Sequence, residues 1–253
     1  MANIRTTAIR DTAGSFVVNG NKTFISGGMN ADFFTTAVRT DPESTGYSGI
    51  SLVLVERQMP GVKTTRLRTQ GWNCSTTTAV AFEDVKVPIE NLIGEEGMGF
   101  VAIMLNFNNE RFSMAVTANR MARCCLEEAI KYATQRETFG KKLVKHQVIR
   151  HKLMECARHI IATNAMIMTI CQQRHNGVPD DQVGGLIALC KVQATKTMEF
   201  VARETFQVFG GKAYIRGGIG GTVERVYREV RVYAIGGGSE EIMLDLASRQ
   251  ARL

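Results

Sequence analysis

The stretch Gly94-Glu-Glu-Gly-Met-Gly99 (GEEGMG) separates two parts of the chain whose hydrophobic patterns have different periods. Before it, short segments rich in valine, threonine, phenylalanine and isoleucine alternate with turn residues, which is typical of β-strands. After it, apolar residues recur every three or four positions over long segments, which is typical of amphipathic helices. The sequence therefore predicts an α+β protein, with a β domain over residues 1–93 and a helical domain over residues 94–253.

The first part predicts a small antiparallel β domain, built as a barrel or a sandwich. Phe16–Val18 and Thr23–Ile25 flank Asn19-Gly20, a dipeptide that accepts the positive φ angles of a two-residue turn, so a hairpin is expected there. Further strands are expected at residues 33–40, 49–56, 62–67 and 78–85, with turns at Pro60-Gly61 and Pro88.

The second part predicts helices at residues 98–137, 145–175, 181–209, 221–234 and 239–252. Gly140, Asn176-Gly177 and Gly210-Gly211 interrupt the helical pattern. Long helices with wide apolar faces indicate a four-helix bundle. A bundle of this size could not cover all of that apolar surface by itself, so self-association as a homodimer or homotetramer is expected.

The composition is that of an ordinary globular protein, with 44% hydrophobic and 22% charged residues. The formal net charge of +7 is spread along the chain, so it indicates either a solvated surface or an anionic ligand such as a nucleotide cofactor or coenzyme A. A nucleic-acid partner is not expected, because no basic block is interleaved with aromatic residues.

Six cysteines without CxxC spacing lie mostly in apolar helical patterns, and indicate thiols in a reducing compartment inside the cell. This would be the mitochondrial matrix or a peroxisome in a eukaryote, or the cytoplasm in a bacterium. The four histidines lack metal-ligand spacing, so no metal site is expected. The longest apolar stretch, near Ile160–Cys171, is too short to span a membrane, and the residues after Met1 lack the apolar core of a signal peptide.

One acidic residue interrupts an apolar pattern in the segment Leu105–Met114 (LNFNNERFSM). Helical spacing places Glu110 on one face with Ile103, Phe107, Met114, Thr117 and Met121. A carboxylate there is a chemical group, a member of a buried Glu–Arg pair, or a surface residue out of phase. Desolvation on an apolar face would raise the pKa of the carboxyl, which would suit a general base near neutral pH.

Five segments, in this order along the chain, resemble the acyl-CoA dehydrogenases. They are Phe24–Gly27 (FISG), Phe82–Gly94 (FEDVKVPIENLIG), Arg136–Gln147 (RETFGKKLVKHQ), Gln207–Gly211 (QVFGG) and Ile235–Met243 (IGGGSEEIM). The resemblance covers essentially the whole sequence and implies the family's middle β domain and C-terminal helical domain. The N-terminal helical domain of that family lies before the point where this sequence begins, and is expected to be absent.

The resemblance implies an FAD flavoprotein. Phe24 and Ser26 match the strand that lies against the isoalloxazine ring, and Arg136 and Phe139 match a corner that reaches the diphosphate and adenine of FAD across a subunit interface. The remaining residues that match cofactor-binding elements are Gln147, Gln207, Gly210, Gly211, Ser239 and Glu241. From spacing alone, Arg136 could equally be a surface cation at a helix end, and Gly210-Gly211 an ordinary helix stop.

The resemblance also implies α,β-dehydrogenation of acyl-CoA thioesters, with a carboxylate base and hydride transfer to flavin N5. In many family members the base lies in a loop that matches Ile235–Gly238, where Gly237 has no side chain. In the long-chain and isovaleryl branches it precedes an arginine on a bundle helix, and Glu110-Arg111 match that arrangement. Glu110 is therefore the expected base, and the Gly237 backbone N–H the expected donor to the thioester oxygen.

Further substrate contacts are expected from Phe107, Asn108, Arg111 and Gly236. Glycine at 236 and 237 is expected to leave room for a long or branched acyl chain. The implied electron acceptor is electron-transferring flavoprotein, and the implied process is fatty acid β-oxidation. The alternative is a non-catalytic, truncated subunit of the same fold with a structural or assembly role, which the missing N-terminal domain favours and Glu110 disfavours.

Overall fold

The computed structural model describes residues 3–252, apart from the side chain of residue 181. It contains two compact units that divide between Asn106 and Phe107, and each is described separately. The first unit holds the predicted strands and the second holds the predicted bundle, so the α+β class is confirmed. The domain boundary predicted between residues 93 and 94 stays a prediction.

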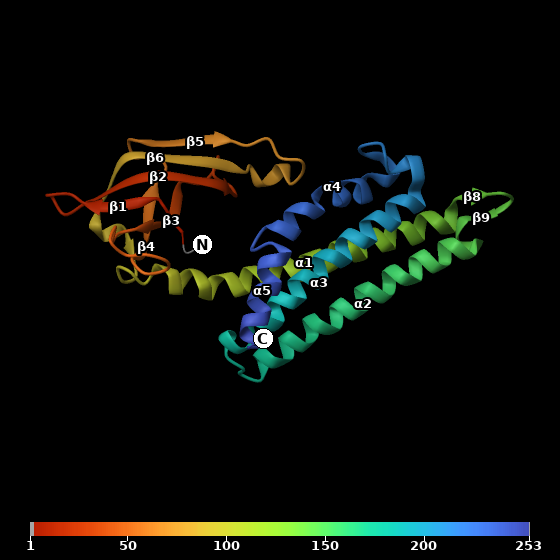
Figure 1. The fold of residues 1–253 in the computed structure, drawn as a ribbon. Coiled ribbons are helices and arrows are strands. Elements are labelled where there is room, and N and C mark those ends of the chain that lie inside the picture. The colour runs from red at the N-terminus through yellow and green to blue at the C-terminus, as the bar shows by residue number, and fades with distance from the viewer. Residues whose placement is uncertain (1–2, 253) are drawn as a thin grey trace. The chain divides into compact units, whose positions relative to one another are not determined.

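The β unit is a seven-stranded sheet in the order β5-β6-β2-β1-β3-β4-β7 (Figure 1). Its strands are β1 (Thr7–Arg10), β2 (Phe16–Ile25), β3 (Phe33–Arg39), β4 (Ile50–Glu56), β5 (Val62–Arg66), β6 (Thr78–Val87) and β7 (Leu92–Ile93). All pairs are antiparallel except β1 and β3, which are parallel where Thr7 faces Arg39. The sequence did not predict β1 or β7, because both are short.

Side chains that alternate along the strands form the core of the β unit. Phe16 and Val18 on β2, Val53 and Val55 on β4, and Val85 on β6 are fully buried. These positions are two residues apart within β2 and β4, which is the spacing that places side chains on one face of a strand. The hydrophobic alternation therefore predicted the buried face as well as the strands.

The predicted hairpin turn at Asn19-Gly20 is wrong, because β2 runs through both residues and pairs with β6 on either side of them. The pairing register shifts between Val18 and Gly20, so the dipeptide lies at an irregularity in a continuous strand. The Asn19 Oδ1 accepts a hydrogen bond of 2.9 Å from the Asp84 N–H, and its Nδ2 donates one of 3.0 Å to Asp84 Oδ1. Gly20 has a φ of 140°, and a Cβ there would lie 2.7 Å from Thr6 Cα.

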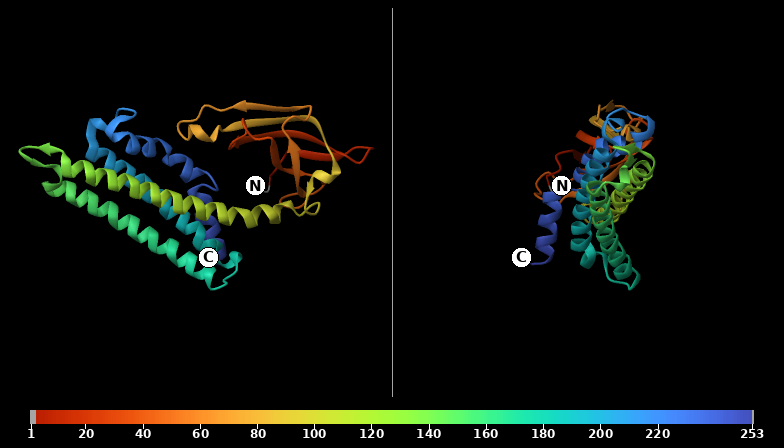
Figure 2. Two further views of the ribbon diagram at one scale, coloured as in Figure 1. Left: turned by 180° about the vertical axis from the view of Figure 1, so that it is seen from behind. Right: turned by 90° about the vertical axis from the view of Figure 1, so that its right-hand side faces the viewer.

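The helical unit confirms the predicted helices to within about two residues at each end. They are α1 (Gly99–Gln135), α2 (Gln147–His175), α3 (Asp180–Phe209), α4 (Gly221–Ile235) and α5 (Glu240–Gln250), and α1 runs through the boundary between the units. A short hairpin of β8 (Glu137–Thr138) and β9 (Lys141–Lys142) joins α1 to α2. Figures 1 and 2 show α2 and α3 side by side, and α3 also packs against α4 and α5.

The buried face of α1 is not the face that the spacing around Glu110 predicted. From Arg111 onward, the buried residues of α1 are Arg111, Ala115, Ala118, Asn119, Ala122, Cys125, Leu126, Ala129 and Ala133. Small side chains, mostly alanine, form most of this stripe. Glu110 lies one position outside it and is exposed, which makes the prediction of a desolvated Glu110 on the apolar face wrong.

No helix within residues 3–252 is both long enough and apolar enough to cross a membrane.

Candidate active site

Within the helical unit, the structure brings the Glu110 segment of α1 to the glycine loop between α4 and α5. The contact is made by Arg111, whose Nε donates a hydrogen bond of 2.8 Å to the Gly237 carbonyl oxygen. These two residues are separated by 126 positions in the sequence. The predicted base and the predicted oxyanion donor therefore belong to segments that are joined directly in the fold.

Arg111 is held by contacts on several sides and is only 8% exposed. Its Nη1 lies 3.5 Å from Asn108 Oδ1, and its guanidinium lies 5.3 Å from the centre of the Phe107 ring. Burial lowers the pKa of the Arg111 guanidinium, and the negative charge of Glu110 opposes that shift. The predicted substrate residues Phe107 and Asn108 thus support Arg111 one turn earlier on the same helix.

A second cation binds the same loop from α3. Lys191 is fully buried, and its Nζ donates hydrogen bonds of 2.9 Å to the Ala234 carbonyl and 2.6 Å to the Gly238 carbonyl. Sequence reasoning missed this residue. Helical spacing places Lys191 with Ile187, Ala194 and Met198, all of which are buried, but the pattern alone does not show whether the lysine packs inward or what it binds.

The glycine loop has a conformation that suits a backbone donor. Gly237 has a φ of 67°, and Gly238 has a φ of 121°. The Gly236 N–H donates to the Val232 carbonyl at 2.8 Å. By contrast, no acceptor anywhere in residues 3–252 receives a hydrogen bond from the N–H of Gly237 or of Gly238. An N–H without a protein partner can donate to a bound ligand.

Met114 fills the space that side chains at 236 and 237 would enter. A Cβ on Gly236 would lie 3.2 Å from Met114 Cε, and one on Gly237 would lie 3.0 Å from the Met114 sulfur. The expectation that the two glycines leave room for a long or branched acyl chain stays a prediction.

The predicted FAD residues Arg136 and Phe139 lie together at the β8–β9 hairpin, where both side chains are exposed. Phe139 is 96% exposed and holds a φ of 50°, which few non-glycine residues adopt. Gln147, the first residue of α2, is also exposed. An exposed guanidinium can bind a diphosphate, and an exposed aromatic ring can stack on a base.

Gln207, Gly210 and Gly211 lie at the end of α3, close to the end of α1. The rings of Tyr132 on α1 and Phe209 on α3 stack with their centres 4.5 Å apart. A Cβ on Gly210 or Gly211 would meet no atom within 4 Å, so the backbone there is open to a ligand.

Ser239 and Glu241 begin α5, directly after the glycine loop. The backbone N–H of Glu241, and then the Ser239 hydroxyl, donate hydrogen bonds that lower the pKa of the Glu241 carboxyl. Both residues lie in the helical unit, near the loop that Arg111 and Lys191 hold.

Phe24 and Ser26 belong to the β unit, at the end of β2. Phe24 is 76% exposed and has a φ of 62°, and Ser26 is also exposed. An aromatic ring held out from a strand end in this way is unusual for a residue whose only role is to pack in a core.

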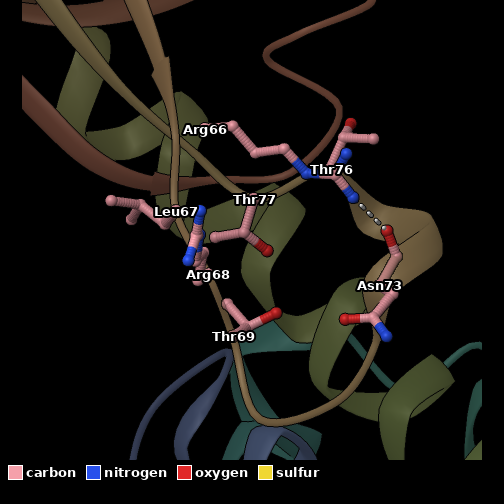
Figure 3. A pocket seen from close by; sticks show the side chains of 7 residues that line it. All are labelled: Arg66, Leu67, Arg68, Thr69, Asn73, Thr76 and Thr77. Atoms are coloured by element: carbon pink, nitrogen blue, oxygen red, sulfur yellow. Dashed lines mark hydrogen bonds between the residues drawn. The ribbon is translucent and has the colours of Figure 1, made fainter.

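The β unit also contains a pocket of about 270 Å³ that the sequence did not predict (Figure 3). It is lined by Arg66, Leu67, Arg68, Thr69, Asn73, Thr76 and Thr77. Arg66 Nη2 lies 3.5 Å from the Asn73 carbonyl oxygen at its edge. None of the predicted site residues lines this pocket.

The fold and these residues define an α+β protein in which a β unit precedes a helical bundle. The sequence matches the family model for the acyl-CoA dehydrogenase middle domain over residues 1–85, and that for the acyl-CoA dehydrogenase C-terminal domain over residues 97–251. The chain belongs to the acyl-CoA dehydrogenase family. The resemblance seen in the five sequence segments is thereby confirmed.

Known proteins agree with this assignment. Acyl-CoA dehydrogenase AFT10-1 of Alternaria alternata is 40% identical over 92% of this chain and 54% of its own length. A probable acyl-CoA dehydrogenase from Mycobacterium abscessus is 40% identical, with a TM-score of 0.93 over 99% of this chain and 64% of that one. The acyl-CoA dehydrogenase of Geobacillus kaustophilus is 33% identical, with a TM-score of 0.94 over 100% and 65%. The chain thus spans between half and two thirds of the length of these relatives.

Proposed function

We propose that this chain forms part of an FAD-dependent acyl-CoA dehydrogenase, which removes hydrogen from the α and β carbons of an acyl-CoA thioester. The observation that carries the proposal is the hydrogen bond from Arg111 to Gly237. It joins the segment that holds a candidate base to the loop that holds the Gly237 N–H, which donates to no acceptor in the described part of the chain. Proton removal next to a thioester needs both groups, because charge develops on the carbonyl oxygen as the proton leaves.

The residues assigned to FAD suit that cofactor. Arg136 and Phe139 would hold the diphosphate and adenine, and the open backbone at Gly210-Gly211 would let a phosphate group approach the amides. Gln147, Gln207, Ser239 and Glu241 would supply further polar contacts, while Phe24 and Ser26 would cover the ring system. Bound FAD would accept the hydride from the β carbon.

Glu110 is assigned the α proton. Its side chain is exposed, so a substrate can reach it, and an acyl chain bound over it would displace water from the carboxylate. Gly237 would donate its N–H to the thioester oxygen, and the negative charge that forms there would be stabilised. Arg111 would fix both groups, since it follows Glu110 directly and binds the Gly237 carbonyl.

The placement of the base favours a long-chain or branched-chain acyl group. The electron acceptor assigned here is electron-transferring flavoprotein, and the process is fatty acid β-oxidation. Phe107, Asn108 and Gly236 are assigned to the substrate because they adjoin Arg111 and Gly237. The buried thiols Cys125, Cys156 and Cys190 fit a reducing compartment such as the mitochondrial matrix or a bacterial cytoplasm.

We further propose that the protein forms a homodimer or homotetramer. The outer face of α2 supports this, because Met154, Ile161 and Met168 are exposed at intervals of seven residues and so lie along one line. A row of exposed apolar side chains on a helix is typical of a surface that another chain covers.

The test of catalysis is Glu110→Gln, which keeps the shape of the side chain but removes the base. With FAD bound and oxygen excluded, mixing with a long-chain acyl-CoA should bleach the visible flavin absorbance of the unmodified protein. We expect the variant to bleach about 100- to 10,000-fold more slowly, because a positioned general base contributes that factor.

The matched control is Glu127→Gln, which changes an exposed glutamate on the same helix. It should leave the bleaching rate within about twofold of the unmodified rate, since a surface substitution away from the site has little effect. If Glu110→Gln bleached at the unmodified rate, Glu110 would not be the base. If the unmodified protein bound FAD but never bleached with acyl-CoA, the non-catalytic alternative would be favoured.

A further inference from the structure

Two cations from different helices hold the loop that joins α4 to α5. Arg111 on α1 binds the Gly237 carbonyl, and Lys191 on α3 binds the carbonyls of Ala234 and Gly238. The Lys191 ammonium therefore joins the last turn of α4 to the residue just before the N-cap of α5. No other side chain in residues 3–252 donates a hydrogen bond to the Ala234 or Gly238 carbonyl.

Lys191 is more than an ordinary cap of the α4 C-terminus. A lysine that complements a helix C-terminus from the surface keeps its charge hydrated. Lys191 is fully buried, and its burial lowers its pKa to about 8; Glu240 and Glu241 on α5 oppose this shift, while Arg111 adds to it. Burying an ammonium is unfavourable unless it is well hydrogen-bonded, so the two carbonyl contacts account for its presence.

These contacts restrict a loop of three consecutive glycines, which would otherwise have great conformational freedom. Gly236 is tied to Val232 through its N–H, and Gly237 is tied to Arg111 through its carbonyl. Lys191 fixes the two ends of the segment. The Gly237 N–H lies at the centre of a segment that is held on both sides, and it donates to no acceptor within residues 3–252.

We propose that Lys191 is a positioning residue that holds the glycine loop so that the Gly237 N–H is aimed at the thioester oxygen. This inference rests on the function proposed above. Lys191 itself does not touch the substrate. A donor fixed before the substrate arrives stabilises developing charge without the cost of ordering the loop at that moment.

The test compares the binding of two ligands in Lys191→Met, which keeps the length of the side chain and removes its donors. One ligand is an acyl-CoA thioester, measured without FAD so that it is not consumed. The other is the thioether in which a methylene replaces the thioester carbonyl. The unmodified protein should prefer the thioester about three- to tenfold, which is the contribution of one hydrogen bond. Lys191→Met should bind both ligands equally, with thioether affinity unchanged.

The control is Lys196→Met, which changes an exposed lysine on the same helix and should keep the preference. If Lys191→Met kept the preference, Lys191 would not position the donor, although the proposed reaction would stand. If the unmodified protein showed no preference, the donor role of Gly237 would fail as well. If Lys191→Met did not fold, the same comparison in Lys191→Gln, whose shorter side chain cannot reach both carbonyls, would decide.

Hydrogen exchange gives a second readout that needs no ligand. Residues 236–239 should exchange faster in Lys191→Met than in the unmodified protein, while the middle of α3 should be unchanged. Equal exchange in the loop would contradict the inference.

Discussion

Gly237 meets two requirements that a larger residue at this position would violate. Its φ of 67° lies in the left-handed region, and a Cβ there would lie 3.0 Å from the Met114 sulfur. The glycine therefore serves the backbone conformation and the packing of α1 against the loop, in addition to any part in binding a thioester. A larger side chain at this position would require Met114 to shift.

Gly237→Ala should lower the free energy of unfolding by about 1–2 kcal/mol, because the new methyl group strains the backbone and crowds Met114. Denaturation with urea would measure the change. Gly211→Ala is the matched control: a Cβ there would meet no atom within 4 Å, so its stability should be equal or slightly higher. Equal stability of Gly237→Ala and the unmodified protein would show that the loop relaxes without cost.

At the scale of elements, β2 shows how a strand can pass through a sequence that favours a turn. Asn19-Gly20 is flanked by strand residues, but β6 pairs with β2 on both sides of the dipeptide. Where the β2–β6 register shifts, the Asn19 side chain makes two hydrogen bonds with Asp84. Gly20, which has no side chain, allows the backbone of Thr6 to approach closely. The irregularity thus keeps one long strand between β6 and β1.

Gly20→Ala should lower the free energy of unfolding of the β unit by about 1–3 kcal/mol, because the added Cβ would lie 2.7 Å from Thr6 Cα. The fluorescence of Trp72, the one tryptophan in the sequence, would follow unfolding of this unit during urea titration. Gly14→Ala separates the effect of φ from that of the contact, since Gly14 has a φ of 86° but open space around it. If Gly20→Ala lowered the free energy of unfolding no more than Gly14→Ala does, the close approach of Gly20 to Thr6 would be contradicted.

At the scale of the whole molecule, the row of exposed apolar side chains on α2 supports the proposed self-association of the chain. Ile161 is 68% exposed, although isoleucine is among the residues most often buried. Met154 and Met168 extend the row by seven residues in each direction. The opposite side of α2 is fixed to α3 by a Thr163–Thr197 hydrogen bond of 2.9 Å and a Lys152–Glu204 ion pair. The row is therefore free to contact a second copy of the chain.

Ile161→Glu should reduce the molecular mass measured by light scattering, because a charge in an apolar interface loses its hydration without gaining a partner. Ala162→Glu is the control: residue 162 is exposed on the same helix but points about 100° away from the row. It should keep the mass of the unmodified protein. If Ile161→Glu also kept that mass, the assembly would not use this face.

The sequence by itself determined the order and type of the main elements and the family. The change of period at Gly94–Gly99 and the five helical patterns are local properties, so they could be read without knowing which surfaces meet. The motifs at Arg136–Gln147 and Ile235–Met243 carried the family assignment for the same reason. The short strands β1 and β7 were missed, because a strand of a few residues is specified by its partners more than by its composition.

The tertiary structure alone decided which charged residues are buried. Glu110 appeared to interrupt an apolar face of α1, but the face that packs inward is a row of alanines beginning at Arg111, and Glu110 is exposed. Lys191 drew no notice in the sequence, yet it is fully buried and holds the glycine loop. A helical pattern gives the directions of side chains. Burial depends on which other elements pack against the helix and which of their backbone carbonyls lie near a side chain. That information is absent from any local stretch.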